Sequence, residues 1–130
     1  MFKLAKTLGS DLRYEVVTLK NENAITYTPG CVLICKEGSV ASAEETSAPE
    51  YIAFAPADPE DTSTVTAMIV TDGMIFKTEY VGNTSPYVGM TVGLAKKNSE
   101  MDSVCHNENG AGTVTGVDEN QGYVYVKFRK

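Results

Sequence analysis

Residues 64–80 (TVTAMIVTDGMIFKTEY) constrain the fold more than any other stretch of this sequence. Two runs rich in β-forming residues flank Asp72-Gly73, a dipeptide that favours the positive φ angles of a tight type I′ turn. The sequence therefore predicts an antiparallel ribbon with one apolar face, and further strands must cover that face because a lone ribbon is marginally stable. The register expected on that face pairs Thr71 with Met74, Ile69 with Phe76, Ala67 with Thr78 and Val65 with Tyr80.

Short β-prone runs recur at intervals of roughly 8–15 residues, with Gly, Pro and Asn turn signals between them. No amphipathic helix longer than about two turns is visible from the apolar spacing. This pattern predicts an all-β fold, a small single-domain β-barrel or sandwich. The other expected strands are residues 13–20, 31–36, 39–41, 51–55, 90–94 (with a bulge or bend at Gly93), 113–117 and 123–128.

Two segments lack a clear strand pattern. We interpret residues 1–12 as a flexible N-terminal arm or a short edge strand, which precedes one β-barrel domain at residues 13–130. Residues 96–109 are polar and irregular, which predicts a loop with room for a short helical turn.

The charge of the chain is unevenly placed. The net charge is −6, and residues 41–72 carry seven acidic side chains and no basic one. An acidic segment repels phosphate, so we expect no nucleic-acid partner. The N-terminus has no apolar run long enough for a signal peptide, and no later run could span a bilayer, so we expect no membrane association. An odd count of three cysteines favours a reducing compartment such as the cytoplasm.

Cys31, Cys35, Cys105 and His106 are the only cysteine and histidine residues in the sequence, so a Cys₃His zinc site must be considered. On one strand, Cys31 and Cys35 would be roughly 13 Å apart, too far for a shared zinc ion or a disulfide. We expect both to be small core residues. His106 is the only histidine, and its neighbour Cys105 cannot face it in an extended chain, so a Cys–His dyad is not expected. The sequence predicts no metal, no other cofactor and no catalytic residue.

The last expected strand offers a candidate binding surface. If Val124, Val126 and Phe128 face the core, Tyr123 and Tyr125 point outward on the side of Arg129. Exposed Tyr and Arg are enriched where proteins bind each other, whereas scattered surface aromatics are the alternative explanation.

The order of these features resembles a known family. Residues 27–41 (YTPGCVLICKEGSVA) combine a turn glycine, an apolar strand and a Glu-Gly turn, and residues 49–53 (PEYIA) return to the core. The run MIFKTE, the segment YVGMTVGL (residues 87–94) and a Gly-bounded hairpin follow. Over roughly residues 25–128, this rhythm of glycines and short strands is similar to the capsid decoration (cement) proteins of tailed bacteriophages.

The resemblance implies a structural virion protein on the exterior of the phage capsid, made in the cytoplasm of the bacterial host. Such a protein is no enzyme: it binds the expanded head, bridges major capsid subunits and associates with further copies of itself there. Phe2 and Leu4 would anchor the arm, and the expected partner-binding residues are Phe2, Leu4, Tyr123, Tyr125 and Arg129.

Two alternatives remain open at this point. A carbohydrate- or peptide-binding β-module on a phage or cell surface would use the outward tyrosines to stack on sugar faces. An enzyme is the third possibility, and it would need the only histidine, His106.

Overall fold

The computed structural model describes residues 1–6, 13–55, 60–97 and 100–129. Across these residues the chain forms eleven β-strands and no helix, which confirms the all-β prediction. The described residues contain no helix that is long and apolar enough to cross a membrane. The strands are β1 (Lys3–Lys6), β2 (Val16–Lys20), β3 (Val32–Lys36), β4 (Ser39–Ser42), β5 (Tyr51–Ala53), β6 (Thr64–Ile69), β7 (Ile75–Tyr80), β8 (Thr91–Lys96), β9 (Met101–His106), β10 (Gly112–Asp118) and β11 (Tyr123–Phe128).

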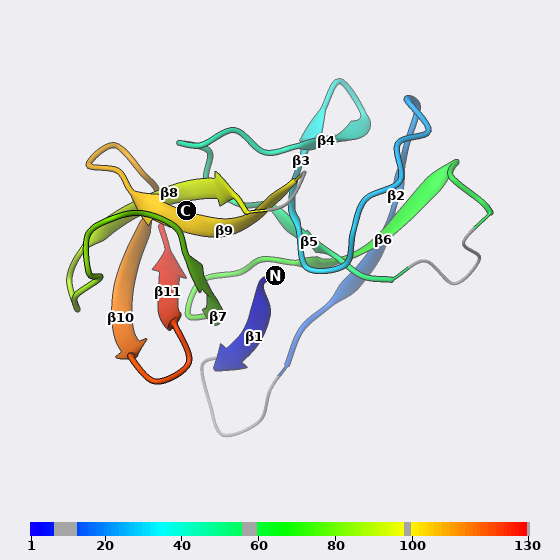
Figure 1. Ribbon diagram of the computed structural model, residues 1–130. Helices are drawn as coiled ribbons and strands as arrows, with labels where there is room; N and C mark the ends of the chain where they lie inside the picture. The colour runs from blue at the N-terminus through cyan, green and yellow to red at the C-terminus, as the bar shows by residue number, and fades with distance from the viewer. Residues whose placement is uncertain (7–12, 56–59, 98–99, 130) are drawn as a thin grey trace.

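Five strands close into a barrel in the order β7-β11-β10-β8-β9, and the ring is completed by the pairing of β9 with β7. All neighbours in the ring are antiparallel except β7 and β9, which are parallel. Closure leaves these strands with few free edges, which is how barrels avoid unwanted strand pairing. Figure 1 shows the barrel on one side of the molecule, the remaining sheet on the other, and β1 between them.

One edge of β7 is shared by two strands. β1 pairs antiparallel with its first half, where Lys3 lies opposite Lys77, and β9 pairs parallel with its last residues, where Tyr80 lies opposite Val104. Residues 3–6 are thus the short edge strand that the sequence left open, and they are not a flexible arm. Residues 7–12 of the predicted arm lie outside the described residues.

The second sheet has the order β2-β6-β5-β3-β4 and is strongly curled. Hydrogen bonds join the two edge strands, β2 and β4. The Ser39 hydroxyl of β4 donates to the Lys20 carbonyl at the end of β2 (3.3 Å) and accepts from the N–H of Glu22, which follows β2 (3.0 Å). A small apolar cluster fills the inside of the curl: Leu19, Tyr27, Cys31, Leu33, Val40, Ala53 and Ala67.

The main core lies between the curled sheet and the barrel and continues into the barrel. Val32, Ile52 and Met68 from the outer face of the sheet belong to the same cluster as Phe76 and Val126 of the barrel. One shared core makes the two sheets a single packed unit, as expected for a chain of this size.

The predicted ribbon of residues 64–80 is wrong. β6 pairs with β2 and β5, whereas β7 pairs with β1, β9 and β11. A turn is present at the expected place, but it is not the predicted type I′. The Met74 N–H donates to the Thr71 carbonyl (3.4 Å) and Gly73 has a φ of 84°, whereas Asp72 does not have the positive φ that a type I′ turn requires. The ribbon is absent because Ala67 and Met68 are both buried on opposite faces of β6, and a two-stranded ribbon cannot cover both faces.

Two further local predictions are wrong. Residues 101–106 of the expected polar loop form β9, in which Asp102, Ser103 and Val104 are buried. Gly93 keeps a regular register with Cys105. The register between β8 and β9 shifts only between Ala95 and Lys96, where Asp102 of β9 is the extra residue.

The other predicted strands are present within a few residues of their expected ends. In the closing hairpin, Val124, Val126 and Phe128 are buried as predicted. The tight two-residue hairpin of this chain is at Glu37-Gly38, where both residues have positive φ (53° and 81°) and Lys36 lies opposite Ser39.

Candidate binding surface

Tyr123 stands between two grooves on the outside of the barrel. It is the first residue of β11, and its neighbours across the sheet are Glu79 of β7 and Asp118 of β10. Because β11 alternates, Tyr123 points away from the core in which Val124 is buried. The ring lines both grooves and is half-buried.

The first groove, called here the loop groove, lies at one end of the barrel and has a volume of about 520 Å³. It is formed by the end of β7, the loop that follows β7, and the β10–β11 hairpin. Its lining mixes aromatic, amide, hydroxyl and carboxylate groups: Tyr80, Gly82, Asn83, Thr84, Ser85, Pro86, Val117, Asp118, Glu119, Gly122 and Tyr123.

Local hydrogen bonds fix the walls of the loop groove. The Tyr80 and Thr84 hydroxyls are 2.7 Å apart, which ties the loop to the barrel strand. Across the groove, Asp118 accepts from the Gln121 N–H through its carboxylate (3.2 Å) and from the Gly122 N–H through its carbonyl (3.0 Å). Gly122 has a φ of 73°, a conformation in which glycine is favoured. The groove therefore exists before any ligand arrives.

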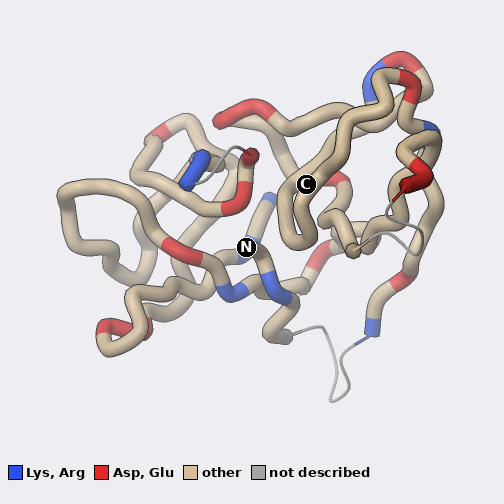
Figure 2. Tube along the Cα trace, turned by 45° about the vertical axis from the view of Figure 1, so that its right-hand side comes forward, with Lys and Arg blue, Asp and Glu red and all other residues tan. Residues whose placement is uncertain are grey.

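The second groove, called here the lysine groove, has a volume of about 340 Å³ and lies on the other side of Tyr123. Its lining residues are Met1, Lys3, Lys77, Glu79, Gln121 and Tyr123. The Lys77 ammonium lies 4.6 Å from the centre of the Tyr123 ring, a cation–π contact that holds the ring in place. In Figure 2, blue segments gather near the N-terminus, although the chain as a whole is acidic.

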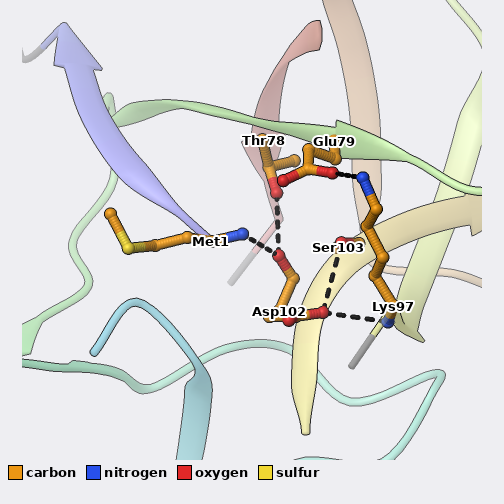
Figure 3. Close-up of polar contacts among 6 residues, drawn as sticks. All are labelled: Met1, Thr78, Glu79, Lys97, Asp102 and Ser103. Carbon is orange, nitrogen blue, oxygen red and sulfur yellow. Dashed lines mark hydrogen bonds and ion pairs between the residues drawn. The ribbon is translucent and has the colours of Figure 1, made fainter. Parts of the chain in front are cut away.

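Polar contacts join the start of the chain, β7 and β9 beside the lysine groove (Figure 3). The Asp102 carbonyl accepts hydrogen bonds from the Met1 amino group (2.7 Å) and from the buried Thr78 hydroxyl (3.1 Å). The Asp102 carboxylate accepts from the Lys97 N–H (3.0 Å) and the Ser103 hydroxyl (3.2 Å). The Lys97 ammonium also forms a hydrogen-bonded ion pair with the Glu79 carboxylate, which raises the pKa of Lys97. Lys3 and Lys77 are the two lysines that line the groove itself.

A third feature is a turn that presents two apolar side chains to solvent. Tyr87 is 58% exposed and Val88 is 65% exposed, the highest values among the large hydrophobic residues described. The Met90 N–H donates to the Tyr87 carbonyl (3.0 Å), and Gly89 has a φ of 94°, as in a type II turn. Two more backbone hydrogen bonds fasten the turn to Val114 of β10. We call residues 87–90 the Tyr87 turn.

The five predicted partner-binding residues do not form one surface in the structure. Phe2 is buried in the main core at 3% exposure and Leu4 is half-buried against it, so neither is a free anchor. Tyr125 is half-buried and covers Gly116, where an added Cβ would lie 3.3 Å from the Tyr125 ring. Arg129 lies six residues beyond Tyr123, roughly 20 Å along an extended chain, where its N–H donates to the Ala111 carbonyl (2.8 Å). Of the five, Tyr123 is the one that lines the grooves.

The cysteines occupy three different environments. Cys31 is buried in the curled sheet as predicted, but Cys35 is exposed, so the prediction that it is a core residue is wrong. The Cys105 thiol donates to the Glu45 carboxylate (3.3 Å), and burial, together with this carboxylate, raises the pKa of Cys105 to about 11. A raised pKa keeps the thiol protonated and weakens it as a nucleophile.

The sequence patterns did not identify Tyr80, Lys77 or the Tyr87 turn as surface features. The turn carried a signal: an apolar pair between Pro86 and Gly89, where turn residues are usually polar. Tyr80 and Lys77 carried none, because their place at the grooves depends on how β7 pairs with β11.

No protein-family model matches this chain, and no curated protein or solved structure matches it. The resemblance to capsid decoration proteins therefore rests on residues 25–128 of the sequence alone.

Proposed function

We propose that this chain is a capsid decoration protein that binds the outside of an expanded phage head and stabilises it by bridging major capsid subunits. The order of strands and glycines in residues 25–128 is the basis for the family, and the Tyr87 turn is the structural observation that supports a protein-binding role. Copies of the chain would occupy repeated sites on the capsid exterior and associate with one another there.

The Tyr87 turn has the properties of an interface anchor. Tyr87 and Val88 are adjacent and largely exposed, and the backbone that carries them is fixed by hydrogen bonds to β10. A preorganised apolar anchor loses little conformational entropy on binding, which favours affinity. Outside an interface, an aromatic and a β-branched side chain at the tip of a turn gain nothing from their exposure.

The proposed stabilisation follows from mass action. A partner that binds the expanded lattice and not its precursor shifts the equilibrium toward the expanded form, by an amount that grows with the concentration of the partner. The excess of acidic residues in the segment 41–72 suits a position outside the shell, away from packaged DNA.

The test is co-sedimentation of the purified protein with expanded, DNA-free heads of its source phage, with unexpanded heads in parallel. We expect saturable binding to expanded heads alone. The double variant Tyr87→Ser/Val88→Ser should weaken that binding at least about tenfold, since each buried apolar anchor contributes more than about 1 kcal/mol.

Ile25→Ser is the matched control, because Ile25 is also an exposed apolar residue (46%) but lies on the side of the curled sheet. It should bind heads as the unmodified protein does. Failure to bind either form of head at concentrations of about 50 μM would reject the decoration role. Binding that Tyr87→Ser/Val88→Ser leaves unchanged would reject the turn as the anchor.

A further inference from the structure

We propose that the loop groove is a binding site for a neutral saccharide. This inference does not depend on the capsid role, because no residue of the Tyr87 turn lines the loop groove, although Pro86 of the groove directly precedes the turn. The volume of the loop groove, about 520 Å³, falls within the range of roughly 300–1,000 Å³ that is typical of small-molecule sites.

The aromatic part of the groove suits a sugar ring. Tyr80 and Tyr123 both line it, and each is half-buried, so part of each ring faces the open volume. A pyranose has a face of C–H groups that packs on an aromatic ring, and a rim of hydroxyls that needs polar partners. The Tyr80 hydroxyl is held by Thr84 and the Tyr123 ring by Lys77, so both rings are oriented in advance.

The polar part of the groove suits the hydroxyls of the same ligand. The Asn83 amide can donate and accept, the Ser85 hydroxyl does both, and the Asp118 and Glu119 carboxylates accept. Asp118 uses one carboxylate oxygen, Oδ1, for the Gln121 N–H. A groove that offers donors and acceptors together with two aromatic rings matches a polyhydroxylated ring better than a purely apolar ligand.

A lysine- or arginine-bearing peptide is the main rival, since Asp118 and Glu119 would attract it. The cation at Lys77 opposes that choice, because its ammonium already lies 4.6 Å over the Tyr123 ring and places a positive charge beside the groove. A second cation would compete with Lys77 for the same ring and be repelled by it. The geometry therefore favours an uncharged ligand.

Titration of the ¹⁵N-labelled protein, followed by amide NMR shifts, tests the site. The probes are maltotriose, a trimer of N-acetylglucosamine and a galactose disaccharide, each to about 10 mM, and a Lys-Gly-Lys peptide at the same concentration. We expect at least one saccharide to shift the amides of residues 82–86 and 118–123 in a saturable way, and the peptide to shift none of them.

Variants make the test specific. Tyr123→Ala should weaken saccharide binding at least about tenfold. Tyr125→Ala is the matched control, because this tyrosine lies two residues further along the same face and lines neither groove, and it should bind unchanged. Asp118→Asn keeps an acceptor for the Gln121 N–H, so it preserves the turn, and it should weaken binding even if Tyr123→Ala proves unstable.

Three results would overturn the proposal: no shift with any saccharide at about 10 mM, shifts with the peptide alone, or equal losses in Tyr123→Ala and Tyr125→Ala. None of them bears on capsid binding, which is measured separately with the Tyr87 turn variants.

Discussion

The ring of Phe2 packs edge-on against the ring of Phe76, with their centroids 6.3 Å apart and their planes at 81°. Phe128 completes the group, at 5.8 Å from Phe2 and 6.2 Å from Phe76. The start of the chain is thereby part of the core of the barrel. Phe2 therefore contributes to the stability of the fold, whereas the family resemblance had implied that it anchors an arm to a partner.

Replacement of Phe2 by Ala should destabilise the protein by about 3–5 kcal/mol, the cost of removing a buried aromatic ring and leaving a cavity. Urea unfolding followed by circular dichroism measures this. Lys3→Ala, at an exposed neighbour on the same strand, should change the midpoint little. Equal midpoints for the two variants would show that β1 is not seated in solution.

Thr78→Val should lower the free energy of unfolding by about 1 kcal/mol, because the buried hydroxyl that donates to the Asp102 carbonyl is replaced by a methyl group. The Asp102 carbonyl keeps its second donor, the Met1 amino group. The same unfolding assay applies. A neutral effect would mean that the hydrogen bond between β7 and β9 adds nothing to barrel closure.

Gly110→Ala should be one of the most damaging single substitutions outside the core. A Cβ at this position would lie 2.0 Å from the Val92 carbonyl oxygen, which belongs to the backbone and cannot rotate away. We expect a loss of about 3 kcal/mol or more, or failure to fold. Gly116→Ala is the control, since its nearest neighbour is the Tyr125 ring at 3.3 Å, which can move. Tolerance of both changes would contradict the close approach of the loop to β8.

Alkaline pH should destabilise the protein partly through Cys105. Burial and the Glu45 carboxylate raise its pKa from 9.0 to about 11 in the folded chain. The contribution is fully present below about pH 9 and is lost as the pH rises toward about 11, because the unfolded chain releases the proton first. Urea midpoints under reducing conditions should therefore fall with pH over this window, and Cys105→Ala should make the fall shallower. An identical fall in both proteins would exclude the thiol as a cause.

The parts of the fold that could be predicted from the sequence are those that depend on neighbouring residues. The closing hairpin was predictable because Val124, Val126 and Phe128 alternate strictly with polar or aromatic neighbours. The Asp72-Gly73 turn was also predictable, but the partners of its two strands were not. A turn sets the direction of the chain over four residues, and the choice between a hairpin and two sheets depends on burial of Ala67 and Met68 by distant strands.

β9 was missed for a related reason. Its buried residues include Asp102 and Ser103, which look like loop residues until their hydrogen bonds to Lys97 and to each other are known. Of the binding surface, the sequence could identify Tyr123 from strand alternation. The lysine groove could not be predicted, because Lys3 and Lys77 meet only through the pairing of β1 with β7.

The shared edge of β7 also has a consequence for how the chain folds during synthesis. Lys3 leaves the ribosome well before its partner Lys77, because all five strands of the curled sheet lie between them in the sequence. Until then β1 has no strand to join, and Phe2 has no ring to pack against. β1 is therefore expected to dock only after β7 has been made, and a nascent chain that ends before β7 should expose Phe2 and Leu4 to chaperones.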